Sequence, residues 1–219
     1  MGLVVYLDTI FIPLSFFVTI GYHAYLWHSF KHKPSSTSIG INTLKRRAWF
    51  LAIKDGDDKK GMLAVQSLRN TLMATILTAT VTILVELSLA ALINNAYNAT
   101  QVFNNPIFGS ESTKIFALKY GSVAVFLSIS FLCSSMAIGF LIDANFLINA
   151  SGEFEFSDVT QTIFEKGFVL ALISNRMLCV CFPLLLWMLG PVPVWLSSIA
   201  LVWGLYQLDF AGNFTKCNC

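Results

Sequence analysis

Five long apolar stretches constrain this chain more than any other feature of its sequence. A helix needs about 20 mostly apolar residues to cross a hydrocarbon core of about 30 Å. The stretches that meet or approach this length cover residues 3–27, 71–96, 120–142, 168–189 and 192–210. Only 12% of the residues are charged, against about a quarter in soluble domains. We therefore predict an all-α integral membrane protein with five transmembrane helices in a single domain over residues 1–219.

A proline-rich turn separates the last two stretches. It reads Gly190-Pro191-Val192-Pro193, and its two prolines lack the backbone donors that would continue a helix. The final two spans are therefore predicted to form a tight helical hairpin.

The basic residues predict the orientation of the chain. Cytoplasmic loops carry an excess of Lys and Arg, and the loop at residues 28–70 holds most of those in this sequence. We therefore expect this loop in the cytoplasm and the N-terminus outside. The basic residues of the loop are Lys31, Lys33, Lys45, Arg46, Arg47, Lys54, Lys59, Lys60 and Arg69.

The same loop contains an amphipathic segment at residues 41–53, with Thr43 as its candidate helix cap. Such a helix fits the inner membrane surface, where anionic lipid attracts basic side chains by about 1 kcal/mol each. The alternative is that the basic residues only set the topology. A second short helix, which could run into the second span, is expected over residues 61–69. The residues predicted to contact lipid headgroups or a partner are Lys45, Arg46, Arg47 and Trp49.

A second loop, at residues 150–167, is acidic. It is expected on the same side of the membrane as the basic loop, so the two either pair electrostatically or are solvated independently. Its acidic residues are Glu153, Glu155, Asp158 and Glu165.

Charged residues inside the apolar stretches are the sharpest functional signal, because each costs about 2.5–3.5 kcal/mol near the bilayer centre. Arg176 lies about 14 Å into its span at 1.5 Å per residue, with Asp8 and Glu86 as candidate partners. These three residues predict either a polar pathway for ions, protons or a small solute, or a structural interhelical pair. Asp143 and Asp209 lie near the inner boundary, where solvation is expected.

Sites for other chemistry are weakly supported. His28 and His32 share a helix face, but beside aromatic residues they favour an interfacial belt over a metal or haem site. We predict no enzyme activity, metal or cofactor, since motifs for soluble-enzyme catalysis are absent from the sequence. The ending Lys216-Cys217-Asn218-Cys219 is either a free tail or a lipidation site at Cys217 and Cys219.

The expected partners follow from this reading. They are the lipid bilayer, including anionic headgroups, and either further copies of the chain or a larger membrane complex. Nucleic acid is not expected. Plasma membrane and endomembrane both suit the span lengths. A small channel or transporter subunit is the first functional hypothesis, and a non-catalytic scaffold or accessory subunit is the alternative.

Several motifs resemble a known family over nearly the whole chain. The pattern is similar to family 599 of the domains of unknown function, multi-span membrane proteins of plants and bacteria. The resemblance implies a membrane protein and no particular chemistry. It is carried by Asp8, Gly21-Tyr22-His23, Pro34, Gly40, Asn42, Arg46-Arg47-Ala48-Trp49, Gly61–Asn70, Arg176, Phe182-Pro183, Leu186-Trp187, Gly190-Pro191 and Asp209.

Overall fold

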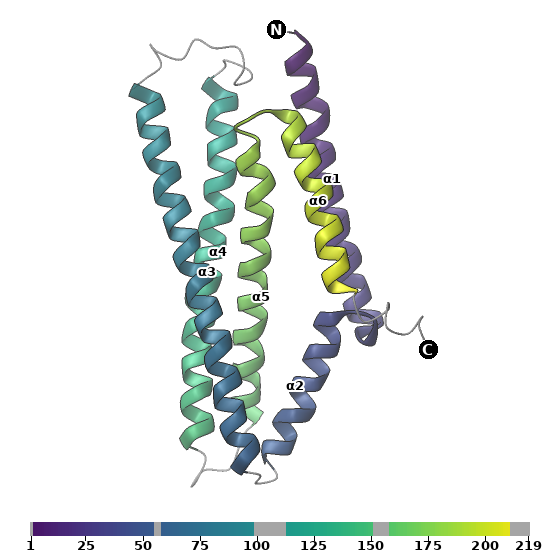
Figure 1. Cartoon of the computed structure of the whole chain (residues 1–219), viewed down its shortest axis with the longest axis vertical. Helices are drawn as coiled ribbons and strands as arrows, with labels where there is room; N and C mark the ends of the chain where they lie inside the picture. Colours follow the sequence, from purple (N-terminus) through teal and green to yellow (C-terminus); the bar gives the residue numbers. More distant parts are fainter. Residues whose placement is uncertain (1, 55–57, 99–112, 151–157, 211–219) are drawn as a thin grey trace. The chain divides into compact units, whose positions relative to one another are not determined.

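The fold is helical throughout the part of the chain that the computed structural model describes, residues 2–54, 58–98, 113–150 and 158–210 (Figure 1). No strand occurs in these residues. The helices are α1 (Gly2–His32), the 3₁₀ helix η1 (Pro34–Ser36), α2 (Ser38–Lys54), α3 (Asp58–Asn98), α4 (Thr113–Ala150), α5 (Asp158–Leu186) and α6 (Pro191–Asp209).

Five of these helices are long and apolar enough to cross a membrane, which confirms the predicted fold class. The candidate spans are Thr9–His32, Met62–Asn95, Leu118–Ile148, Val159–Leu186 and Pro191–Asp209. Because these spans carry most of the described chain, the protein is an integral membrane protein. The orientation inferred from the basic residues stays a prediction.

Several helices continue well beyond the apolar stretches. α3 has 41 residues and is about 60 Å long at 1.5 Å per residue, roughly twice the hydrocarbon core. The short helix expected at residues 61–69 is continuous with the second span as the first part of α3. α5 begins before its apolar stretch, and α4 extends beyond its stretch at both ends. Counting apolar residues finds only the most apolar part of a helix, whereas good helix formers such as Gln66 and Arg69 continue α3 beyond it.

Contacts divide the chain into two compact units. The first unit comprises the described parts of Met1–Arg46, Ala99–Val123 and Cys179–Cys219. The second comprises the described parts of Arg47–Asn98 and Ala124–Leu178. Three helices, α2, α4 and α5, therefore contribute to both units.

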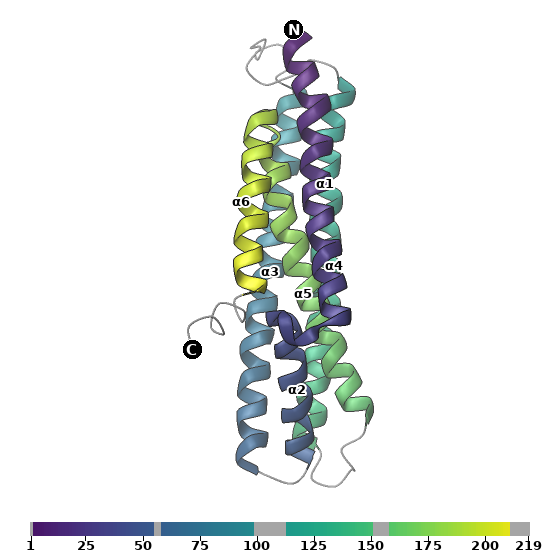
Figure 2. The same ribbon diagram turned by 90° about the vertical axis from the view of Figure 1, so that its right-hand side faces the viewer.

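In the first unit, α1 and α6 pack side by side and run in the same direction (Figures 1 and 2). Near their beginnings Phe11 stacks on Trp195, with ring centroids 6.2 Å apart. Near their ends Tyr25 lies against Phe210 at 5.6 Å. The predicted hairpin before α6 is confirmed, with the turn slightly earlier than expected. α5 ends at Leu186 rather than at residue 189, and Gly190 takes a φ of 136°, which favours glycine.

In the second unit, α3, α4 and α5 are side by side, and their buried residues recur at seven-residue spacing. On α4 the buried positions advance by alternating steps of three and four residues, the pattern of a left-handed coiled coil. We call these buried residues the seam. They are Ala64, Leu68, Thr75, Thr82 and Leu89 on α3, Leu127, Ser130, Ser134, Ala137, Leu141, Ala144 and Ile148 on α4, and Thr160, Phe164, Gly167 and Ser174 on α5.

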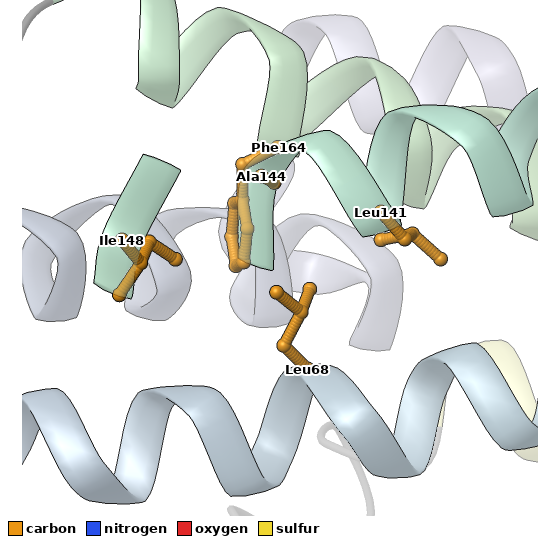
Figure 3. Close-up of a cluster of buried hydrophobic side chains, with 5 residues drawn as sticks. All are labelled: Leu68, Leu141, Ala144, Ile148 and Phe164. Carbon is orange, nitrogen blue, oxygen red and sulfur yellow. The ribbon is translucent and has the colours of Figure 1, made fainter. Parts of the chain in front are cut away.

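The seam changes composition along its length. Its middle holds hydroxyl and small side chains. At the end where α3 begins, large apolar side chains from all three helices form a compact cluster, drawn in Figure 3. This cluster contains Leu68, Leu141, Ala144, Ile148 and Phe164. The unit therefore has two kinds of interior, one polar and one apolar.

The start of α2 is fixed by Thr37 rather than by the predicted cap Thr43. The Thr37 hydroxyl accepts a hydrogen bond from the Gly40 N–H at 3.1 Å, which is the arrangement of a helix N-cap. Thr43 lies inside the helix and donates to the Ile39 carbonyl at 2.8 Å. The predicted cap was wrong because α2 begins at Ser38, before the amphipathic segment at residues 41–53. The missing side chain of Gly40 allows the Pro34 backbone to lie close to it.

Gly40→Ala tests this turn. A Cβ at Gly40 would lie 2.1 Å from the Pro34 carbonyl oxygen, so the backbone must shift. We expect the free energy of unfolding to fall by about 1–3 kcal/mol, as for other overpacked sites, measured as thermal stability in detergent. Gly204→Ala is the control, because nothing lies within 4 Å of the position of its Cβ. Equal stability of the two variants would contradict the observed turn.

Candidate functional site

Hydroxyl groups join the three helices of the second unit in the middle of the seam. Ser130 on α4 donates a hydrogen bond to the Ser174 carbonyl on α5 at 2.8 Å, and the Ser174 hydroxyl donates back to the Ser130 carbonyl at 2.9 Å. A further short hydrogen bond joins the hydroxyls of Ser134 and Ser174. Thr82 on α3 lies 3.4 Å from the Ser130 hydroxyl oxygen. All four side chains are fully buried.

This hydroxyl cluster was not predicted from the sequence. Ser and Thr are unremarkable within apolar stretches, where charged residues are the sharper functional signal. The signal was nevertheless present in the spacing, because Thr75 and Thr82 are seven residues apart and Ser130 and Ser134 are four apart. Hydroxyls on one helix face are typical of contacts between membrane helices.

Of the residues predicted to form a polar pathway or an interhelical pair, Glu86 is the best described. It is half-buried on α3, one helical turn beyond Thr82, and its Oε1 accepts a hydrogen bond from the Ser128 hydroxyl at 2.7 Å. Arg176 is half-buried on α5 in the same unit. Asp8 belongs to α1, but its side chain lies outside the described residues. The pairing of Arg176 with either carboxylate stays a prediction.

The two carboxylates expected at the inner boundary have different environments. Asp143 is exposed on α4, as expected. Asp209, at the end of α6, is only 2% exposed, so the expected solvation of Asp209 was wrong. Its Oδ2 accepts a short hydrogen bond from the Tyr22 hydroxyl on α1. The helix dipole disfavours a carboxylate at a helix C-terminus, and burial adds a further cost. The hydrogen bond from the Tyr22 hydroxyl helps to offset both costs for Asp209.

A second contact holds the same end of α6. The Ser38 hydroxyl at the start of α2 donates to the Leu208 carbonyl at 2.9 Å, one of the carbonyls that a helix end leaves without an intrahelical partner. Around it, Tyr22, Leu26 and Leu205 form a buried apolar cluster with Phe210. The first unit therefore joins α1, α2 and α6 at one point.

The basic residues of α2 have separate environments. Lys45 is exposed, and burial lowers the pKa of the half-buried Arg46. Arg47 forms two hydrogen bonds with Glu165 of α5, from Nε to Oε1 at 2.8 Å and from Nη2 to Oε2 at 2.7 Å. These hydrogen bonds and the charge of Glu165 raise the pKa of Arg47. Trp49 is half-buried.

This ion pair confirms the predicted alternative in which the acidic loop at residues 150–167 pairs with the basic loop, through one residue of each. Gln161 also donates to Glu165 Oε1 at 2.8 Å, so the carboxylate is held by two neighbours. Glu153 and Glu155 lie outside the described residues, as do the side chain of Asp158 and the candidate lipidation sites Cys217 and Cys219.

The described histidines and cysteines do not form a metal site. The rings of His28 and His32 stack with centroids 4.2 Å apart. Cys133, Cys179 and Cys181 are not in disulfide bonds. The described side chains contain no group of three or more His, Cys, Asp or Glu residues placed to hold a metal ion.

The fold and these contacts define a multi-pass helical membrane protein whose interhelical contacts include buried hydroxyls and stacked aromatic rings. Residues 10–214 match the family model described as protein of unknown function, DUF599. The chain therefore belongs to this family, as its motifs predicted. Comparisons with the curated proteins and with the solved structures found no match.

Exchanging the charges of Arg47 and Glu165 tests their ion pair. Arg47→Glu places like charges together, so we expect lower thermal stability, and adding Glu165→Arg should restore most of the loss. A double-mutant cycle should give a coupling of about 0.5–1 kcal/mol, typical of partly exposed pairs. Lys45→Glu, the same charge change at an exposed site on the same helix, is the control. Additive effects of the two exchanges would show that the pair contributes nothing.

Proposed function

We propose that the protein is a non-catalytic membrane scaffold or accessory subunit rather than a conduit. The observation that carries this proposal is the hydroxyl cluster of the second unit. Ser130, Ser134 and Ser174 are fully buried and satisfy one another directly. Polar groups that hydrogen-bond to each other across helices hold the helices together. A transport path instead needs polar groups that a permeating solute can reach.

The apolar cluster at the end of the seam supports the same proposal. Large apolar side chains are stabilised by burial where the alternative is water, but gain little where the alternative is lipid. The burial of Leu68, Leu141 and Phe164 against one another therefore suggests that this end of the unit lies outside the hydrocarbon of the bilayer. Leu68 and Phe164 lie just before the predicted spans that begin at residues 71 and 168, and Leu141 lies at the edge of the span that ends at residue 142. The apolar helices of the structure extend further, over Met62–Asn95, Leu118–Ile148 and Val159–Leu186.

The Arg47–Glu165 ion pair lies near this end of the unit. It attaches the second half of α2 to α5, so the basic helix is held by the protein itself. We propose that the attached end is the surface that a partner protein or further copies of the chain recognise. Anionic lipid headgroups remain a proposed partner for the exposed Lys45.

Transport is the second candidate, because one observation favours it. Glu86 is an ionisable residue within a candidate span, and such residues are functional candidates by default. Its hydrogen bond to Ser128 occupies one carboxylate oxygen. A proton or cation could use this carboxylate if an opening reached it.

Ion flux in proteoliposomes separates the two candidates. The purified chain is reconstituted, and fluxes of H⁺, K⁺ and Cl⁻ are recorded with fluorescent dyes. The scaffold proposal predicts fluxes equal to those of protein-free liposomes. Flux that is present in the wild type and lost in Glu86→Gln or Arg176→Gln, with thermal stability unchanged, would instead establish transport. A gramicidin-containing sample is the positive control for the K⁺ and H⁺ dyes.

A further inference from the structure

A small cavity lies in the first unit among α1, α5 and α6. Its volume is about 20 Å³. One side is formed by Ser15, Phe16 and Thr19 of α1, and the opposite side by α5 and α6. The residues lining it from those two helices are Val180, Pro183, Leu184, Val194 and Ser198.

The Ser15 hydroxyl is a buried polar group without a protein partner. The residue is 4% exposed, and no hydrogen bond is made by its Oγ. The Ser15 carbonyl is different, since it accepts the Thr19 hydroxyl at 2.9 Å. Leaving a buried hydroxyl unsatisfied costs about 1–3 kcal/mol, and most buried polar groups avoid that cost by binding protein or water.

The size of the cavity restricts what could bind there. A water molecule needs roughly 10–15 Å³ and two to four polar partners. The cavity, which is partly open and mostly apolar, meets the first condition. Ser15, Thr19 and Ser198 are its polar lining residues, and their hydroxyls would meet the second. The Thr19 oxygen already donates, so it can only accept a further hydrogen bond. A drug-sized ligand pocket would need about 300 Å³ or more.

We propose that this cavity is a binding site for one ordered water molecule, which accepts a hydrogen bond from the Ser15 hydroxyl and donates to the hydroxyl oxygens of Thr19 and Ser198. The water would join α1 to α6 at a level where Pro183 interrupts the hydrogen bonding of α5, because proline has no N–H to donate. It would supply to the first unit the interhelical hydrogen bonds that the serines of the second unit make directly.

Water-edited solid-state NMR tests the site in the full chain embedded in lipid bilayers. The protein carries ¹³C at serine Cβ, and magnetisation is transferred from water. We expect the Ser15 signal to build up faster than those of Ser130 and Ser134. These two serines are matched controls, because both are equally buried but bonded to protein. Equal build-up rates for the three residues would overturn the proposal.

The sign of a stability change gives a second test. If water satisfies Ser15, Ser15→Ala removes a hydrogen bond, and the melting temperature should fall by about 2–4 °C. If the hydroxyl is unsatisfied, the same change removes a cost, and the melting temperature should rise. Ser197→Ala is the control, since its hydroxyl bonds to Val194 within its own helix. A rise for Ser15→Ala would overturn the proposal.

Discussion

Lipid as a solvent is the constraint on which the rest of this structure depends. Hydrocarbon tails solvate apolar side chains as well as a protein core does, so burial alone cannot hold membrane helices together. Hydrogen bonds and close packing of small side chains must do so. The serines of α4 and α5 meet this requirement, because each backbone carbonyl of the Ser130–Ser174 pair accepts the hydroxyl of the other residue.

The two units satisfy this constraint in different ways. The second unit uses hydroxyls in the middle of its seam and large apolar residues at one end. The first unit uses aromatic stacking along α1 and α6, and a buried carboxylate held by a tyrosine. In both units these contacts fix the register of the helices, because each one joins specific residues rather than two uniform apolar surfaces.

Sequence reasoning recovered the features that depend on local chemistry. The lengths of the apolar stretches predicted the five spans. The amphipathic pattern predicted a helix at residues 41–53, where α2 covers Ser38–Lys54, and the Gly190-Pro191 turn predicted the hairpin. Tertiary contacts were harder. The burial of Asp209 depends on Tyr22, which lies 187 residues away, and no local pattern reports such a partner. Pairing of the acidic loop with the basic one was one of two alternatives, and only the fold identifies Glu165 and Arg47 as partners.

The central claim is that the interior of the second unit is apolar where its helices face water and polar where they face lipid. Measuring the membrane depth of positions along α3 tests this claim most directly. Spin labels at successive exposed positions from Met62 to Leu92 would report oxygen and nickel-chelate accessibility by electron paramagnetic resonance. We expect water accessibility at Gln66 and Arg69, and hydrocarbon depth from Met73 through Leu84, where the hydroxyl cluster lies. Hydrocarbon depth at Gln66 would place the apolar cluster inside the lipid and contradict the account.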